Sequence, residues 1–328
     1  MEPLNVCIVG YGGIAVFHCE ALQQIEGVRL HTVVGRRREP TDAFRRRFGF
    51  LNARIDLAEA LADDDVHAVV ITSPSELHVD QSLAALNAGK HVLVEIPMAM
   101  SHRGAAEVTG TAHRSPGRLM VAHTRRFEPV GRFAGDFLHS EKAGAVYQHQ
   151  SYSYWLRHEN VGWTGYQRSW TDDVLFHHGC HLVDFSLWAV GADVRRVKGE
   201  LSPLDPTIGT SMDVSLLIRY ANEAIGTISL SYNSRRSSSG NRFICENGTL
   251  ELAGKTVTWN GETVFEAAEG LDDGVLAQDQ EFVAAIREGR EPSCGAGDAL
   301  QALEVLQQVY DQTTTAEGVE KYRRMWER

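Results

Sequence analysis

The stretch Val6-Cys7-Ile8-Val9-Gly10-Tyr11-Gly12-Gly13-Ile14-Ala15 is typical of a buried strand, a tight turn and the start of a helix. It matches the pattern G-x-G-x-x-G/A, in which Gly10 permits the turn, Gly12 lets backbone approach a pyrophosphate and Ala15 allows close helix packing. The free N–H groups and the dipole at the helix start attract an anion. An ordinary strand-to-helix turn is the alternative. We predict dinucleotide binding and assign to it Gly10, Gly12, Gly13 and Ile14.

The surrounding residues extend this turn into a doubly wound α/β fold. Short β-branched runs alternate with amphipathic stretches, as βαβ units around a buried parallel sheet do. Asp56 followed by Glu59 suits a helix N-cap, and Gly89 suits a helix C-terminus. The expected strands are 4–9, 30–34, 68–71, 92–94 and 119–122. The expected helices are 14–25, 41–48, 56–61, 76–88 and 102–113.

The pattern changes after residue 122 to longer alternating strands, which favours a mostly antiparallel sheet with one covered face. We therefore predict an NADP-binding domain over 1–122 and a substrate-binding and oligomerisation domain over 123–328. Strands are expected over 145–154, 212–220, 224–231, 242–246, 249–252 and 256–259. Helices are expected over 172–190, 275–287 and 299–312.

Charge and composition exclude several classes of protein. The 328 residues include 32 Lys and Arg against 43 Asp and Glu, a net charge of −11, which argues against nucleic-acid or anionic-membrane surfaces. No apolar run reaches the ~18 residues of a membrane helix, and the first residues do not resemble a leader. The five cysteines are widely spaced without a C-x-x-C pattern. We expect an unprocessed, cytoplasmic protein with reduced thiols.

The second expected strand ends in Gly35-Arg36-Arg37, where an acidic residue would bind the ribose 2′-hydroxyl of NAD. Gly35 leaves room there, and Arg36 with Arg37 can hold a 2′-phosphate. The sequence therefore predicts NADP in preference to NAD, with NAD still possible. A solvated basic loop is the alternative.

Further polar residues follow the later strands, at the sheet edge where open α/β folds bind ligands. They are Thr72, Ser73, Pro74 and His78, then Glu95 and Pro97 of Glu95-Ile96-Pro97. With Arg125-Arg126-Phe127-Glu128-Pro129 and His181-Leu182-Val183-Asp184, these motifs make the whole chain resemble the glucose-fructose oxidoreductase / inositol dehydrogenase (Gfo/Idh/MocA) family.

The resemblance implies an N-terminal Rossmann domain and a C-terminal α/β domain with an open, mostly antiparallel sheet. It also implies a homo-oligomer, dimer or tetramer, assembled through that sheet. The implied reaction is hydride transfer between NAD(P) and a carbinol or carbonyl carbon.

Two departures from the family pattern point to a subgroup. Ile96 stands in place of the family's lysine, and His177 stands in place of the aspartate of its Asp-x-x-x-His pair. With His123-Thr124-Arg125-Arg126-Phe127 and Arg168-Ser169-Trp170-Thr171-Asp172, they resemble the dehydrogenases of 4-carboxy-2-hydroxymuconate-6-semialdehyde, which serve aromatic compound degradation. Their substrate reacts as a cyclic hemiacetal and yields 2-pyrone-4,6-dicarboxylate with NADP.

Two histidines are the candidate proton acceptors. Residues four apart share a helix face, so His177 and His181 are expected to point into one site. Imidazole suits acid–base work near neutral pH. We assign His181 as base, with His177 as partner or alternate, and count Glu95 as a catalytic candidate that shapes the nicotinamide edge. Structural histidines and a zinc site are alternatives, although the resemblance predicts no metal.

A carboxylated substrate needs cations, because burying an unpaired carboxylate is costly. The candidate substrate-binding residues, beside His177 and His181, are His123, Arg125, Arg126, Arg157, Tyr166 and Arg168. This favours an anionic ring substrate over a neutral sugar. A sugar or inositol dehydrogenase and a non-catalytic NADP-binding regulatory protein are the rival functions.

Overall fold

The computed structural model describes residues 2–161, 173–268 and 274–313. These residues form two compact units. The first contains residues 2–122, 161 and 275–300, and the second contains 123–160, 173–268, 274 and 301–313. The division predicted from the sequence placed 275–300 in the second half, whereas these residues belong to the first unit.

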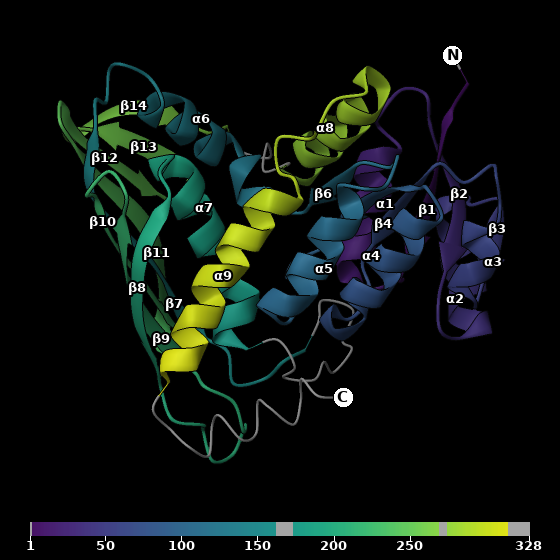
Figure 1. The fold of residues 1–328 in the computed structure, drawn as a ribbon, viewed down its shortest axis with the longest axis horizontal. Helices are drawn as coiled ribbons and strands as arrows, with labels where there is room; N and C mark the ends of the chain where they lie inside the picture. The colour runs from purple at the N-terminus through teal and green to yellow at the C-terminus, as the bar shows by residue number, and fades with distance from the viewer. Residues whose placement is uncertain (1, 162–172, 269–273, 314–328) are drawn as a thin grey trace. The chain divides into compact units, whose positions relative to one another are not determined.

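The first unit is built on a six-stranded parallel sheet with the order β3-β2-β1-β4-β5-β6 (Figure 1). Because the order reverses beside β1, dinucleotides bind at this switch point in such folds. β1 and β4 are apolar and almost wholly buried, as strands of a sheet covered on both faces are. The predicted doubly wound sheet is confirmed, with β3 added. The strands are β1 (Leu4–Val9), β2 (Val28–Val34), β3 (Asn52–Arg54), β4 (Ala68–Ile71), β5 (His91–Val94) and β6 (Leu119–Val121).

The helices of the first unit begin and end close to the predicted positions. The Asp56 carboxylate accepts a hydrogen bond from the Ala58 amide at 2.9 Å and so caps α3. Gly89 follows α4 with a φ of 74°, a conformation that favours glycine. The helices are α1 (Gly13–Leu22), α2 (Arg38–Phe48), η1 (Ser75–Leu77), α3 (Leu57–Leu61), α4 (His78–Asn87), α5 (His102–Ala112) and α8 (Gly274–Glu288), the last beginning at the unit boundary.

The second unit is built on an eight-stranded sheet with the order β14-β13-β12-β11-β7-β10-β9-β8. Among the described strands of this sheet, only β7 and β10 pair in parallel, so the predicted mostly antiparallel sheet is confirmed. β8 and β14 were not predicted, and β11 is longer than the expected strand. The strands are β7 (Val146–Leu156), β8 (Val194–Leu201), β9 (Asp213–Tyr220), β10 (Ile225–Ser231), β11 (Asn233–Cys245), β12 (Gly248–Ala253), β13 (Thr256–Trp259) and β14 (Glu262–Glu266).

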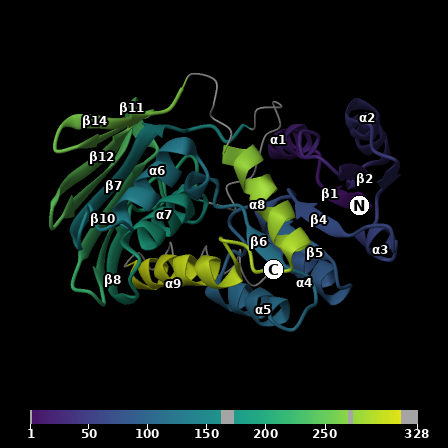
Figure 2. The ribbon, with the colours of Figure 1, turned by 90° about the horizontal axis from the view of Figure 1, so that it is seen from above.

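Helices cover one face of this sheet. Figure 2 shows α6 (Pro129–Leu138) and α7 (Cys180–Val190) on the same side, and both contact the strands. α9 (Ala296–Gln312) adds its residues from 301 onward to this unit. Along β9, buried and exposed side chains alternate, so the opposite face carries partly exposed residues.

The helix expected over 172–190 is not wound uniformly. Residues Val174–Gly179 form a π-helix, and the α-helix begins at Cys180. The Asp173 carboxylate caps this segment by accepting hydrogen bonds from the amides of Leu175 at 2.9 Å and Phe176 at 3.0 Å. A π-helix winds more loosely than an α-helix. His177 and His181 are therefore not related by regular α-helical spacing, although the charge of His177 still acts on His181.

Within the described residues, none of the helices has the length and hydrophobicity to cross a membrane. All five cysteines are buried and free.

Candidate active site

Gly10 forms the turn after β1 with a φ of +114°, which L side chains rarely adopt. A Cβ built there would lie 2.7 Å from Thr72 Oγ1 and 2.8 Å from the Thr72 carbonyl oxygen. The Thr72 hydroxyl donates to the Val9 carbonyl at 2.9 Å. Thr72 therefore closes the turn from the end of β4, and only glycine fits at position 10.

Gly12 is the N-cap of α1, and no side chain caps this helix end. A Cβ built on Gly12 would meet no protein atom within 4 Å. The space beside Gly12 at the start of α1 is therefore open, as the site of a pyrophosphate requires. The residues present fit a dinucleotide, whose phosphates would be held by the backbone at Gly12, Gly13 and Ile14.

The ribose end of this site differs in one respect from the expectation. A Cβ on Gly35 would lie 2.3 Å from Thr41 Oγ1 and 2.4 Å from Tyr11 Cε1, so packing already fills the space beside Gly35. Arg36 and Arg37 are exposed next to it. A phosphate would therefore have to be held by the arginine side chains, beyond the Tyr11 ring.

His78 joins the turns that follow β4 and β5. Its Nδ1 lies 2.8 Å from the Pro97 carbonyl oxygen, and its Nε2 lies 2.9 Å from the Ser73 carbonyl oxygen. The Ser73 hydroxyl donates to Gln81 at 2.6 Å. The peptide between Ile96 and Pro97 is cis. His78, predicted to bind the cofactor, thus bridges the two turns that border the site, and Pro74 directly precedes the short η1 helix beside it.

Sequence reasoning missed two residues of this region. His18 on α1 lies 3.0 Å from Glu95 Oε1 through Nε2, and 2.9 Å from Asp279 Oδ2 through Nδ1. His18 and Asp279 are fully buried. The sequence offered one signal for His18, namely its position on the apolar face of α1. Its partner Asp279, in α8, could not be identified from local sequence.

In the second unit, His181 has the properties of a neutral base. Burial, followed by the charges of Arg125, His123 and His177, holds the pKa of His181 well below its ordinary value. Its Nδ1 is buried and accepts or donates no hydrogen bond among the described residues. An imidazole that stays unprotonated at neutral pH can accept a proton.

Among the charged neighbours of His181, Arg125 lowers the pKa of the imidazole the most. Burial lowers the pKa of Arg125, and Glu128 opposes this shift. Within the described part of the chain, the Arg125 guanidinium makes no hydrogen bond. A largely buried cation without a bonded carboxylate suits an anionic group of a ligand.

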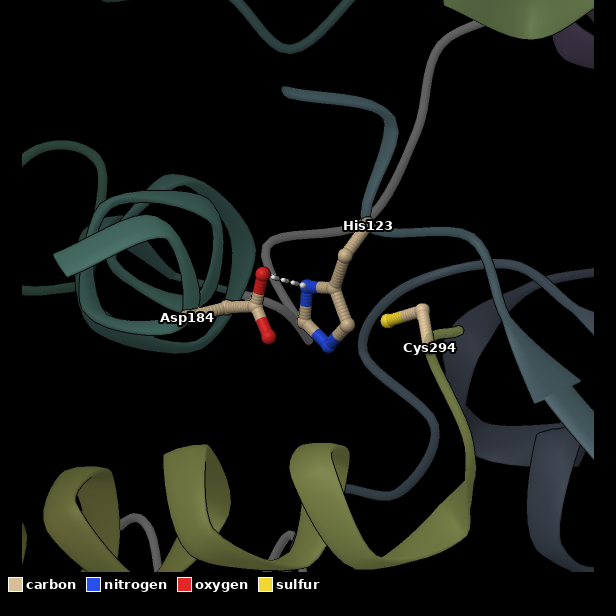
Figure 3. A group of neighbouring side chains, drawn as sticks. All are labelled: His123, Asp184 and Cys294. Atoms are coloured by element: carbon tan, nitrogen blue, oxygen red, sulfur yellow. Dashed lines mark ion pairs between the residues drawn. The ribbon is translucent and has the colours of Figure 1, made fainter. Parts of the chain in front are cut away.

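Arg126 points elsewhere and makes a buried ion pair. Its Nε donates to Asp184 Oδ2 at 2.8 Å and its Nη2 donates to Asp184 Oδ1 at 2.5 Å. Figure 3 shows the His123 ring with Nδ1 facing the same carboxylate, at 3.5 Å from Oδ2. The Arg126 guanidinium is therefore already paired with the Asp184 carboxylate. Arg126 and His123 both contact α7 through Asp184.

Arg157, directly after β7, belongs to a polar network with His178 of the π-helix and with Tyr232, which lies between β10 and β11. Its Nη1 lies 3.2 Å from His178 Nδ1, its Nη1 donates to the Tyr232 hydroxyl at 3.3 Å, and its Nη2 donates to Asn160 Oδ1 at 2.6 Å. The same His178 Nδ1 lies 2.5 Å from the Tyr232 hydroxyl. Burial, then the charges of His177 and Arg157, hold the pKa of His178 well below its ordinary value. The sequence did not identify His178 or Tyr232 as members of this network.

Two of the predicted substrate-binding residues, Tyr166 and Arg168, lie outside the described residues. Cys180 is buried, and burial followed by the charge of Asp184 raises the pKa of its thiol, so it does not supply a thiolate.

Comparison with known proteins shows the family. A family model described as "Oxidoreductase family, NAD-binding Rossmann fold" matches residues 4–123, and one described as "Bacterial oxidoreductases, C-terminal" matches 137–262. The chain is 35% identical to 4-carboxy-2-hydroxymuconate-6-semialdehyde dehydrogenase of Sphingobium sp. SYK-6, over 92% of this chain and 96% of that protein. The chain belongs to the Gfo/Idh/MocA family. As a member, it is an NAD(P)-dependent oxidoreductase of the dehydrogenase type.

Other Gfo/Idh/MocA relatives act on sugars and inositols. The chain is 27% identical to a scyllo-inositol 2-dehydrogenase (NADP(+)) of Bacillus subtilis, over 58% of this chain and 53% of that protein. Two solved structures share the fold. Levoglucosan dehydrogenase in complex with NADH and L-sorbose has a TM-score of 0.84 at 20% identity, with 98% of each chain covered. GenD2 from gentamicin A biosynthesis, in complex with NAD, has a TM-score of 0.82 at 24% identity, covering 95% of this chain and 94% of that one.

Proposed function

We propose that this protein is an NADP-dependent dehydrogenase that oxidises a carboxylated cyclic hemiacetal, of the type that turns the hemiacetal of 4-carboxy-2-hydroxymuconate-6-semialdehyde into 2-pyrone-4,6-dicarboxylate. The observation that carries the proposal is the His181 ring, whose buried Nδ1 has no hydrogen-bond partner among the described residues and whose pKa is lowered by burial and by the charge of the largely buried Arg125 guanidinium. The match to the Sphingobium dehydrogenase over nearly the whole chain supports the substrate class.

His181 takes the proton of the carbinol hydroxyl in this proposal. The dinucleotide, when bound, accepts the hydride from the carbinol carbon, which becomes a carbonyl carbon. His181 suits its role because its lowered pKa keeps the ring unprotonated at neutral pH. Removing a general base costs roughly 10²- to 10⁴-fold in rate, so His181→Ala should lose kcat on this scale. His177, whose charge affects His181, is the partner or alternate base.

Arg125 binds a substrate carboxylate in this proposal, because it is largely buried and makes no hydrogen bond within the described residues. Arg126 has a different role, since its guanidinium is bonded to Asp184. His123 and Arg157 stay candidates for polar contacts to substrate, as do Tyr166 and Arg168. Arg157 would have to share its guanidinium with the His178 and Tyr232 network.

The preference for NADP rests on Arg36 and Arg37. Both are exposed at the end of β2, where the position of a ribose-binding acid is occupied by Gly35. The two guanidinium groups favour a 2′-phosphate.

A substrate screen tests the whole proposal. Purified protein is incubated with NADP or NAD and with carboxylated ring-fission semialdehydes, sugars or inositols, while the absorbance of reduced nicotinamide is followed. We expect turnover with the carboxylated semialdehydes and a higher kcat/KM with NADP. Turnover of sugars or inositols alone would favour the sugar dehydrogenase. Cofactor binding without any turnover, unchanged in His177→Ala plus His181→Ala protein, would favour a regulatory protein.

We also propose that the protein forms a homo-oligomer through the face of its eight-stranded sheet that none of the described helices covers, called here the uncovered face. Tyr152 on β7, Leu217 on β9 and Ile244 on β11 lie on this face, each with about two fifths of its side chain exposed. Apolar residues gathered on one sheet face suit a contact with another subunit.

A further inference from the structure

The first unit buries a histidine between two carboxylates that come from distant parts of the chain. His18 lies on α1, Glu95 follows β5 and Asp279 lies on α8. His18 Nε2 is 3.0 Å from Glu95 Oε1, and His18 Nδ1 is 3.0 Å and 2.9 Å from the two Asp279 carboxylate oxygens. The side chains of His18 and Asp279 are inaccessible to solvent, and that of Glu95 is 14% exposed.

This geometry suits a charged imidazole. Carboxylates lie at both ring nitrogens, and only the protonated ring has a donor on each. Burial by itself lowers the pKa of an imidazole, but the charges and hydrogen bonds of Asp279 and Glu95 outweigh it and raise the pKa of His18 to about 10. Burial raises the pKa of the Asp279 carboxyl, and the His18 cation opposes that rise. The neighbouring Cys19 thiol stays neutral, because burial and then Asp279 raise its pKa.

The position of the trio in the fold gives the cation a role beyond stability. His18 lies on the helix whose first amides face the expected pyrophosphate, and Glu95 opens the turn that ends in Pro97. His78 holds the other end of this turn through the Pro97 carbonyl at 2.8 Å. Ile96, between them, is buried and brings no charge. The turn at the nicotinamide edge is thus held from both ends by histidines.

We propose that His18 is a positioning residue for hydride transfer: its imidazolium fixes the Glu95 carboxylate, and with it the Glu95-Ile96-Pro97 turn, relative to α1. Asp279 orients His18 and keeps it protonated. This inference rests on the proposed function only in taking the turn as the nicotinamide edge. The trio acts through the turn and does not touch the reacting atoms.

Two substitutions of His18 separate this role from plain packing. A glutamine amide reaches the place of Nε2 and can still donate to Glu95, whereas an asparagine amide reaches only the place of Nδ1 and keeps the Asp279 contact. Misplacement of a positioning group costs on the order of 100-fold in the chemical step. We expect His18→Asn to slow single-turnover hydride transfer by roughly 10- to 100-fold, with a much smaller change in KM, and His18→Gln to retain most of the rate. Equal losses in both variants would overturn the proposal.

A pH profile provides the second measurement. In the natural protein the rate should stay level up to about pH 10, where His18 loses its proton. Asp279→Asn removes the larger of the two charges that raise the pKa of His18, so an alkaline fall in the rate should move to lower pH. An Asp279→Asn profile that matches the natural one would contradict the proposal. His91→Gln is the matched control, because His91 lies at the opposite end of β5 and accepts a hydrogen bond from the Arg118 amide at 3.0 Å.

Fluorescence of bound NADPH makes the test independent of the substrate. The emission of the reduced nicotinamide reports its surroundings, so His18→Asn should change the bound spectrum while His18→Gln and His91→Gln leave it unchanged. Failure of the natural protein to bind NADPH or NADH would count against the proposed function. Normal binding with identical spectra in all variants would count against His18 alone.

Discussion

The Arg126 guanidinium and the Asp184 carboxylate form a two-point ion pair, in which Nε donates to Oδ2 at 2.8 Å and Nη2 donates to Oδ1 at 2.5 Å. The Arg126 and Asp184 side chains are 5% and 1% exposed. Breaking a buried pair leaves one charge unpaired in a low-dielectric interior, which costs about 3–5 kcal/mol. We therefore expect Arg126→Met to lower the free energy of unfolding by about this amount, measured by urea denaturation.

A matched control is the exposed pair of Arg195 and Glu223, whose side chains are 64% and 65% exposed. Arg195→Met should change the free energy of unfolding by at most about 1 kcal/mol. The double variant Arg126→Met with Asp184→Leu should recover much of the lost stability, because no buried charge remains unpaired. If Arg126→Met is as stable as the natural protein, the pair has no structural role.

The pH dependence of the reaction should depend on Arg125. The lowered pKa of His181 means that the base stays neutral as pH falls, and that kcat/KM declines only where pH passes below that lowered value. Arg125→Gln removes a positive neighbour, so the pKa of His181 should rise toward its ordinary value. The acid limb of kcat/KM should then move to higher pH. Arg132→Gln, an exposed arginine on α6, should leave the limb in place.

Substitutions of the two glycines in the turn after β1 should change different properties of the protein. Gly12→Ala adds a Cβ that meets no protein atom within 4 Å, so the melting temperature should stay near that of the natural protein while dinucleotide affinity falls. Gly10→Ala puts an L side chain at a φ of +114° and against Thr72, so it should lower the melting temperature itself. Circular dichroism and NADPH titration measure the two quantities. Unchanged affinity in Gly12→Ala would remove the turn from the cofactor site.

Arg36 and Arg37 should determine which dinucleotide is used. Hydrogen bonds between charged groups contribute about 1.5–3 kcal/mol each, so Arg36→Ala and Arg37→Ala should each raise KM for NADP by about tenfold or more. KM for NAD should change little, because NAD lacks the 2′-phosphate. Arg38→Ala is the control, since Arg38 is exposed beside them as the first residue of α2. Equal effects on both dinucleotides would show that these arginines do not select NADP.

The local sequence predicted those features whose cause is local. The strand, glycine turn and helix around Gly10 follow from residues close together in the chain, and the Asp56 cap is formed two residues on. The contacts of His18 could not be predicted in this way, because Asp279 lies 261 residues away. Residues 275–300 belong to the first unit because of tertiary packing, and the local sequence carries no signal for it.

The substrate-binding half shows where adjacency in sequence misleads. Arg125 and Arg126 were assigned the same role, yet on the 3₁₀ turn η2 (Thr124–Arg126) they have different surroundings. Arg126 is bonded to Asp184, whereas the charge of Arg125 acts on His181. The spacing of His177 and His181 assumed an α-helix, whereas Val174–Gly179 is a π-helix, and the charge of His177 still acts on His181. Such winding depends on packing, which periodicity does not report.

The uncovered sheet face should hold the subunits together. Thr227 on β10 lies opposite Leu217 on one side and Gln150 on the other, and Ser229 lies between Ser215 and Tyr152. The centre of this face thus combines small hydroxyl residues with partly exposed apolar side chains, a surface against which a second copy can pack closely. Placing a charge there should be costly only in the assembled state.

Leu217→Arg together with Tyr152→Lys should therefore convert the oligomer to monomers in sedimentation equilibrium, because two charges per subunit would be buried without partners. The far-ultraviolet circular dichroism spectrum should not change, since both positions are solvent-facing within one subunit. Leu51→Lys, at an apolar residue of the first unit that is 56% exposed, should leave the assembly intact. An oligomer that survives the double substitution would show that another surface makes the contact.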